Sequence, residues 1–223
     1  MLDARTVYRI LDARLPSHAG SSTSGLVGTP VAELLSPPDL LDRIRVPSRM
    51  YGTRDLRVLG TLWWYSASSV LVAPTVESLV VTATALDPAR VTVFIHPDGR
   101  MPAARSDAVC SDAGAALRSL IGSFASVLGE LLGVSERVFW ALAADSLANR
   151  VLWAGGTPES AVSLAGEIGE SLPVPRFVSA GGQDVVRRGS CCLIYETRGA
   201  GKCVSCPRQE PEERAARLRE VFG

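Results

Sequence analysis

Apolar residues recur every three or four positions along several stretches of this chain, which is the pattern of amphipathic helices. The clearest stretch runs from Asp112 to Gly133, a second from Ser135 to the Gly155-Gly156 pair, and a third from Thr157 to Ile168. The second and third stretches begin with Ser135 and Thr157, residue types that can cap a helix N-terminus, and glycine commonly follows a helix end. The pattern predicts three consecutive helices that pack as a bundle.

Shorter helices are predicted nearer the chain ends. Leu2 to Leu15 is amphipathic and stops before Pro16, and Asp39 to Arg45 follows Ser36, a possible N-cap. At the other end, Glu210 to Phe222 has acidic residues first and basic residues later, which suits the helix dipole. These segments add helices at both ends of the chain.

Val58 to Val76 contains no charged side chain over nineteen residues, close to the length that crosses a bilayer. Gly, Thr, Ser and Pro residues dilute its apolar content, and Arg57 and Glu77 stand directly beside it. We therefore expect a buried helix that continues past Pro74, and no stable membrane insertion.

Strand signals are few. Arg90 to His96 alternates in hydrophobicity, and Pro97-Asp98-Gly99 follows as a turn, which predicts a hairpin into residues 101–104. His96 ends the strand, where it could border a pocket, although a lone histidine is usually structural. The fold class is therefore α+β, a helix-dominated body with a small antiparallel sheet.

Three other segments have no clear period. Ser17 to Thr29 is rich in Ser and Gly and is interpreted as a flexible loop with a solvated His18. Pro173 to Gly182 contains Pro and Gly and is interpreted as a linker, and Leu193 to Glu196 as a brief strand.

Four of the five cysteines lie close together in the C-terminal region, at Cys191, Cys192, Cys203 and Cys206. Four thiolates suit either a tetrahedral zinc ion or an iron-sulfur cluster. Cys203 and Cys206 have the spacing of a zinc knuckle, but adjacent cysteines do not, because neighbouring side chains on an extended backbone diverge. A two-metal cluster accommodates that divergence more easily. Zinc, disulfides and free thiols remain alternatives, and Cys110 is expected to be a small, partly buried thiol.

This pattern, two adjacent cysteines, ten residues, then Cys-x-x-Cys, resembles the C-terminal motif of FhuF-type ferric siderophore reductases. The resemblance implies that Cys191, Cys192, Cys203 and Cys206 hold a [2Fe-2S] cluster. It also implies a body with a small antiparallel sheet beside a helical bundle, and a cleft for the siderophore. The linker that ends at Gly182 sets the division into this body, residues 1–182, and a cluster-binding segment with a closing helix, residues 183–223.

The function implied by the resemblance is that of an oxidoreductase in iron acquisition. Such an enzyme transfers one electron to ferric iron in a hydroxamate-type siderophore, in the cytoplasm. A non-enzymatic electron carrier or sensor, and a zinc-stabilised interaction module, are the alternative functions.

Neither a Gly-rich phosphate loop nor a flavin motif is present, so electrons are expected from a donor protein such as a ferredoxin. Arg187, Arg188 and Lys202, the only lysine in the chain, flank the cysteines. They are candidates for docking the substrate or the donor, or for offsetting the negative charge of the cluster.

Composition narrows the class of protein further. The 223 residues carry no net charge, so the overall charge balance gives no sign of nucleic-acid binding. No charged start followed by an apolar run and a cleavage site is visible near Met1, so a cytoplasmic location is expected. Structural disulfides are disfavoured in that compartment.

Overall fold

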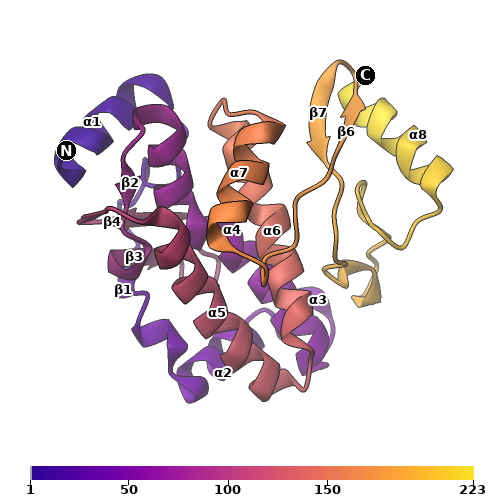
Figure 1. Ribbon diagram of the computed structural model, residues 1–223. Coiled ribbons are helices and arrows are strands. Elements are labelled where there is room, and N and C mark those ends of the chain that lie inside the picture. The colour runs from indigo at the N-terminus through magenta and orange to yellow at the C-terminus, as the bar shows by residue number, and fades with distance from the viewer. Residues whose placement is uncertain (1) are drawn as a thin grey trace.

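Four packed helices form the centre of the molecule (Figure 1). The computed structural model describes residues 2–223. The predicted run of three helices is confirmed as α5 (Ala113–Leu132), α6 (Glu136–Trp153) and α7 (Pro158–Ile168). All three contact one another, and α5 and α6 also pack on α4 (Leu56–Thr82). The side chain of Thr157 caps α7 as predicted, in a reciprocal capping box with Ser160.

Helix α4 is the buried helix that the uncharged stretch predicted, and it passes through Pro74 without ending. Trp64 lies in the core, and its indole N–H donates to the carbonyl of Phe139 at 2.8 Å. Trp63, Trp64 and Phe124 form an aromatic group that joins α4 to α5. Because almost the whole length of α4 is covered by other elements, its apolar character reflects a protein core.

In the described chain, one helix, α5, is long and apolar enough to cross a membrane by length and composition alone. It is amphipathic: Leu117, Ile121 and Phe124 are fully buried in the core, whereas Arg118 is exposed. This is the pattern of a helix that covers the core of a folded body.

A small antiparallel sheet lies beside the helices, with strand order β1-β3-β4. Its strands are β1 (Val27–Pro30), β3 (Val91–Ile95) and β4 (Ala103–Ser106). Val91 and Val93 point into the core, as the alternation predicted. The helix-dominated α+β fold with a small antiparallel sheet is thus confirmed.

The remaining elements of the first half are short, apart from the predicted N-terminal helix. They are α1 (Ala4–Arg14), η1 (Glu33–Leu35), α2 (Pro37–Arg45), α3 (Ser48–Tyr51), η2 (Pro88–Arg90), and the paired strands β2 (Ala85–Leu86) and β5 (Val109–Cys110). Ser36 occupies the N-cap position of α2, but its side chain makes no capping hydrogen bond.

The interpretation of residues 17–29 as a loop with a solvated histidine is wrong for His18. Its side chain is 2% exposed, and its Nε2 lies 2.8 Å from Oδ1 of Asp12. Next to it, the N–H of Ala19 donates to the buried carboxylate of Glu77 at 2.9 Å. Tertiary contacts with α1 and α4 therefore fix a segment whose composition indicated flexibility.

Two predictions for the C-terminal region are also wrong. The expected linker contains β6 (Phe177–Ala180), which forms an antiparallel hairpin with β7 (Gln183–Val186). The expected strand at residues 193–196 is a 3-10 turn, η3 (Ile194–Glu196). The closing helix α8 (Pro211–Phe222) forms as predicted and packs against β6 (Figure 1).

The division into residues 1–182 and 183–223 remains a prediction. Its boundary falls in the turn of the β6–β7 hairpin, and β7 also packs on α6.

Candidate metal centre

The four C-terminal cysteines lie together against the N-terminal part of α4. Cys191, Cys192 and Cys206 are buried and Cys203 is partly buried. The first three form an apolar cluster with Leu193 and with two α4 residues, Val58 and Leu62, and Cys203 packs against this cluster. Helix α4 and the C-terminal segment, which are distant in sequence, thus enclose the four thiols in one region.

The sulfur atoms of Cys191 and Cys206 are 3.7 Å apart. Two thiolates on one tetrahedral metal, with metal–sulfur bonds of about 2.3 Å, are separated by nearly this distance. The other two, Cys192 and Cys203, are joined through Arg188, whose Nη1 lies 3.5 Å from the sulfur of Cys192 and 3.3 Å from that of Cys203. The four sulfurs are therefore grouped as two pairs.

A left-handed backbone turn at Leu193 directs the two adjacent cysteines into the same region. Leu193 has φ of +65°, a conformation that costs a residue with a side chain about 1–2 kcal/mol. In this turn the N–H of Leu193 donates to the sulfur of Cys191 at 3.4 Å, and the N–H of Ile194 to that of Cys192. The turn overcomes the divergence expected for neighbouring side chains and brings two N–H dipoles to sulfur.

Cys203 and Cys206, which have the spacing of a zinc knuckle, lie on one tight turn, but their sulfurs are grouped with different cysteines. The N–H of Cys206 donates to the carbonyl of Cys203 at 3.0 Å, which closes a tight turn. The amide of buried Gln209 donates to the same carbonyl at 2.7 Å. These bonds fix the backbone between the two cysteines.

Arg188 is buried among the sulfurs. Its Nη1 lies 3.3 Å from the sulfur of Cys203 and 3.5 Å from that of Cys192, and its guanidinium lies over the ring of Tyr65 at 4.4 Å. Hydrogen bonding from Cys203, followed by the charge of Arg188, lowers the pKa of Cys192 to about 5 despite burial. Burial by itself would lower the pKa of Arg188. The hydrogen bond to the sulfur of Cys192 and the negative charge there raise this pKa more than burial lowers it, so it stays above its usual value. The arrangement stabilises a thiolate.

Asp145 on α6 anchors the backbone before the cysteine pair. Its carboxylate accepts the N–H of Gly189 and lies 3.6 Å from Nε of Arg188. Burial raises the pKa of Asp145 to about 6, against the opposing effects of Gly189 and Arg188. Sequence reasoning missed this residue, although a carboxylate inside the apolar run of α6 was a signal.

The three flanking cations have different environments. Arg187 and Lys202 are exposed, and the ammonium of Lys202 donates to the carbonyl of Arg208. The side chain of Arg188 is only 3% exposed, and the expectation that it docks a substrate or a donor stays a prediction. Its contacts fit the alternative, compensation of negative charge at the sulfurs.

The residues present suit an anionic iron-sulfur group. The Nη2 atom of Arg188 is buried without a hydrogen-bond partner, and Nη1 of the same guanidinium contacts two sulfurs, so an anionic group at the sulfurs would supply acceptors. In residues 2–223, no three Cys, His, Asp or Glu side chains converge as one metal ion would require. Two sulfur pairs beside a buried cation fit a two-metal cluster better than a single zinc ion.

Comparison with known families agrees with this chemistry. Residues 188–208 match the model of the FhuF 2Fe-2S C-terminal domain, and all four clustered cysteines fall within the match. The cofactor indicated for this segment is a [2Fe-2S] cluster. No curated protein matches the chain. Cys110 lies outside the match and is partly buried, as predicted.

Proposed function

We propose that this protein reduces ferric iron in a hydroxamate-type siderophore complex, with Cys191, Cys192, Cys203 and Cys206 as the ligands of its [2Fe-2S] cluster. The observation that carries the proposal is the convergence of these four thiols, two of which contact buried Arg188, within the segment that matches the FhuF 2Fe-2S domain. The match covers the cluster segment, so the reaction itself is our inference.

The bound cluster would supply one electron, which converts ferric iron to ferrous iron in the chelate. Hydroxamate oxygens are hard ligands that hold ferric iron much more tightly than ferrous iron, so reduction releases the metal. The role of the surrounding chain is to hold the sulfurs, exclude water and set the potential. Arg188 and the N–H groups of Leu193 and Ile194 favour added negative charge at the sulfurs, and so favour the reduced state.

The electron donor in this proposal is a separate protein of the ferredoxin type, because the chain has no nucleotide or flavin motif. Exposed Arg187 and Lys202 are the candidates for docking an acidic donor. Reduction would take place in the cytoplasm.

Single-turnover kinetics test the proposal. Anaerobic protein, reduced with dithionite and freed of excess reductant, is mixed with a ferric trihydroxamate chelate while the visible spectrum and trapped ferrous iron are followed. We expect one ferrous ion per electron, at a rate well above that of a small [2Fe-2S] ferredoxin of similar potential. The gallium chelate, which accepts no electron under these conditions, controls for spectral changes caused by binding.

A rate equal to that of the ferredoxin would contradict the reductase assignment and favour an electron carrier or sensor. Colourless protein with one zinc per chain would instead establish the zinc-stabilised interaction module.

A further inference from the structure

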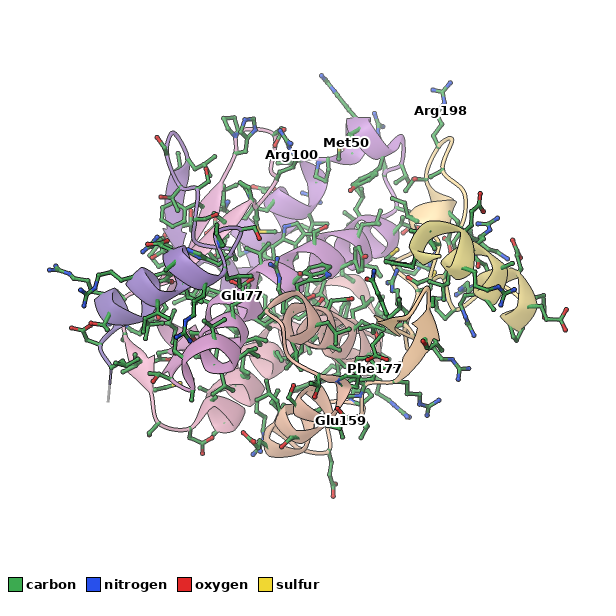
Figure 2. The ribbon with its side chains drawn as sticks, turned by 90° about the horizontal axis from the view of Figure 1, so that it is seen from above. Met50, Glu77, Arg100, Glu159, Phe177 and Arg198 are labelled. Carbon is green, nitrogen blue, oxygen red and sulfur yellow. The ribbon has the colours of Figure 1, made fainter. Side chains whose placement is uncertain are left out.

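A cavity of about 490 Å³ lies between α3, α4 and the turn that joins β3 to β4. Met50, Leu62 and Trp63 supply apolar walls, and His96, Asp98 and Arg100 supply the polar side. Met50 and Arg100 lie at the same edge of the molecule, with Arg198 farther along it (Figure 2). We propose that this cavity is the binding site for the ferric chelate, an inference that rests on the function proposed above.

The cavity and the sulfurs share a wall. Tyr51 and Leu62 line the cavity, and both also pack against the apolar cluster that contains Cys191, Cys192 and Cys206. Tyr51 and Leu62 therefore belong both to the wall of the cavity and to the surroundings of the thiols. Because electron transfer slows steeply with distance, a site that shares wall residues with the surroundings of the thiols is well placed for reduction.

The backbone also fixes α3, which carries one wall of the cavity, to the cysteine segment. The carbonyl of Tyr51 accepts the N–H of Arg198 at 3.0 Å. Gly52, in the left-handed conformation with φ of +62°, lies directly against the side chain of Arg198. The loop between Cys192 and Cys203, which contains Arg198, thus sets the position of this wall relative to the sulfurs.

The charges in the cavity favour a chelate without net charge. The carboxylate of Asp98 is 2.7 Å from Nε of Arg100 and 2.9 Å from Nδ1 of His96, so the cation of Arg100 already has a partner. Ferric iron with three hydroxamates is neutral, whereas a tris-catecholate complex carries three negative charges that this cavity would leave unpaired. No hydrogen bond in residues 2–223 engages the Nη groups of Arg100, which can donate to hydroxamate oxygens.

A second hollow, of about 310 Å³, gives more direct access to sulfur. It is lined by Cys191 itself, together with Val138, Arg57 and Arg208. It is smaller, and Arg57 at its edge is already paired with Glu196 while Arg208 lies over the ring of Tyr195, so its size suits a small group better than a trihydroxamate complex. It is the rival site in the experiment below.

The test measures equilibrium binding of gallium trihydroxamate chelate to the cluster-loaded protein by titration calorimetry, which is independent of turnover. Ser66 is exposed on α4 and lines the cavity, so Ser66→Trp should fill it. We expect this variant to bind at least about tenfold more weakly with an unchanged visible spectrum. Arg100→Gln, which leaves the walls intact, should weaken binding several-fold.

Ser163→Trp is the matched control, since Ser163 is exposed on α7 and lines neither hollow. It should bind like the unmodified protein.

Normal binding by Ser66→Trp together with loss of binding by Val138→Trp would overturn the proposal in favour of the hollow at Cys191, and would leave the reductase function standing. Absence of binding by the unmodified protein would overturn both. Tighter binding of the gallium tris-catecholate would overturn the charge argument.

Discussion

The N–H of Gly189 lies between the two carboxylate oxygens of Asp145, at 2.9 and 3.1 Å, which joins α6 to the backbone just before the cysteine pair. The two residues are distant in sequence, and the carboxylate is buried. The cysteine segment is therefore held by the helical body in addition to its own turns.

The first prediction concerns this anchor. Asp145→Asn removes the charge that accepts from Gly189 and faces Arg188, and a buried hydrogen bond to a charged group contributes about 1.5–3 kcal/mol. We expect iron to be released to a strong chelator about tenfold faster than from the unmodified protein. Release is followed by the loss of visible absorption under anaerobic conditions. An unchanged release rate would show that Asp145 has no part in holding the segment.

Arg188 should set the reduction potential. Its guanidinium lies closest to Cys203 and Cys192, and a cation there stabilises the more negative, reduced state. Arg188→Gln should lower the potential by about 60 mV, equivalent to about 1.4 kcal/mol for one electron. Arg188→Lys keeps the charge, so its reduction potential in a spectroelectrochemical titration should lie between those of the unmodified protein and Arg188→Gln. A shift to higher potential in the Gln variant would refute this role.

The helical body was largely predictable from the sequence, because its buried positions follow a regular period over long segments such as Asp112 to Gly133. The cysteine spacing likewise indicated the type of centre. His18 could not be assigned correctly, because its burial depends on Asp12 and on contacts beside Glu77 in another helix. The residues next to His18 in the sequence do not indicate these tertiary contacts.

Within the site, the side chains of the adjacent cysteines were expected to diverge, but Leu193 is left-handed and turns the backbone. A leucine carries no sequence signal for that conformation, since tertiary packing imposes it. Arg188 and Lys202 were equivalent in the sequence as cations near cysteine. Only the fold shows that Arg188 is buried and Lys202 exposed.

The ligand set can be tested with a matched pair of cysteine variants. Cys192→Ser replaces a sulfur that contacts Arg188, and it should shift or abolish the visible absorption of the cluster. Cys110→Ser changes a thiol in β5, outside the centre, and should leave the spectrum intact. Identical spectra for Cys192→Ser and the unmodified protein would exclude Cys192 as a ligand.

Gly52 should be sensitive to a single added methyl group. A Cβ at this position would lie 2.7 Å from Cβ of Arg198, and φ of +62° is unfavourable for residues with a side chain. Gly52→Ala should therefore lower the free energy of unfolding by about 2 kcal/mol and weaken chelate binding, because α3 must move away from the cysteine segment.

Gly166→Ala provides the control, since Gly166 is within α7 and has nothing near its missing Cβ. That substitution should raise stability by up to about 1 kcal/mol. Equal effects of the two substitutions in denaturant unfolding would contradict the proposed contact between Gly52 and Arg198.

The nature of the centre is tested most directly by chemical analysis of protein purified without oxygen. Iron, acid-labile sulfide and zinc are quantified in the same sample, alongside its visible absorption. If the four thiols hold a [2Fe-2S] cluster, iron and sulfide should be present in equal amounts, two of each per chain, in coloured protein without zinc. One zinc per chain with no sulfide, or protein without any metal, would contradict the account.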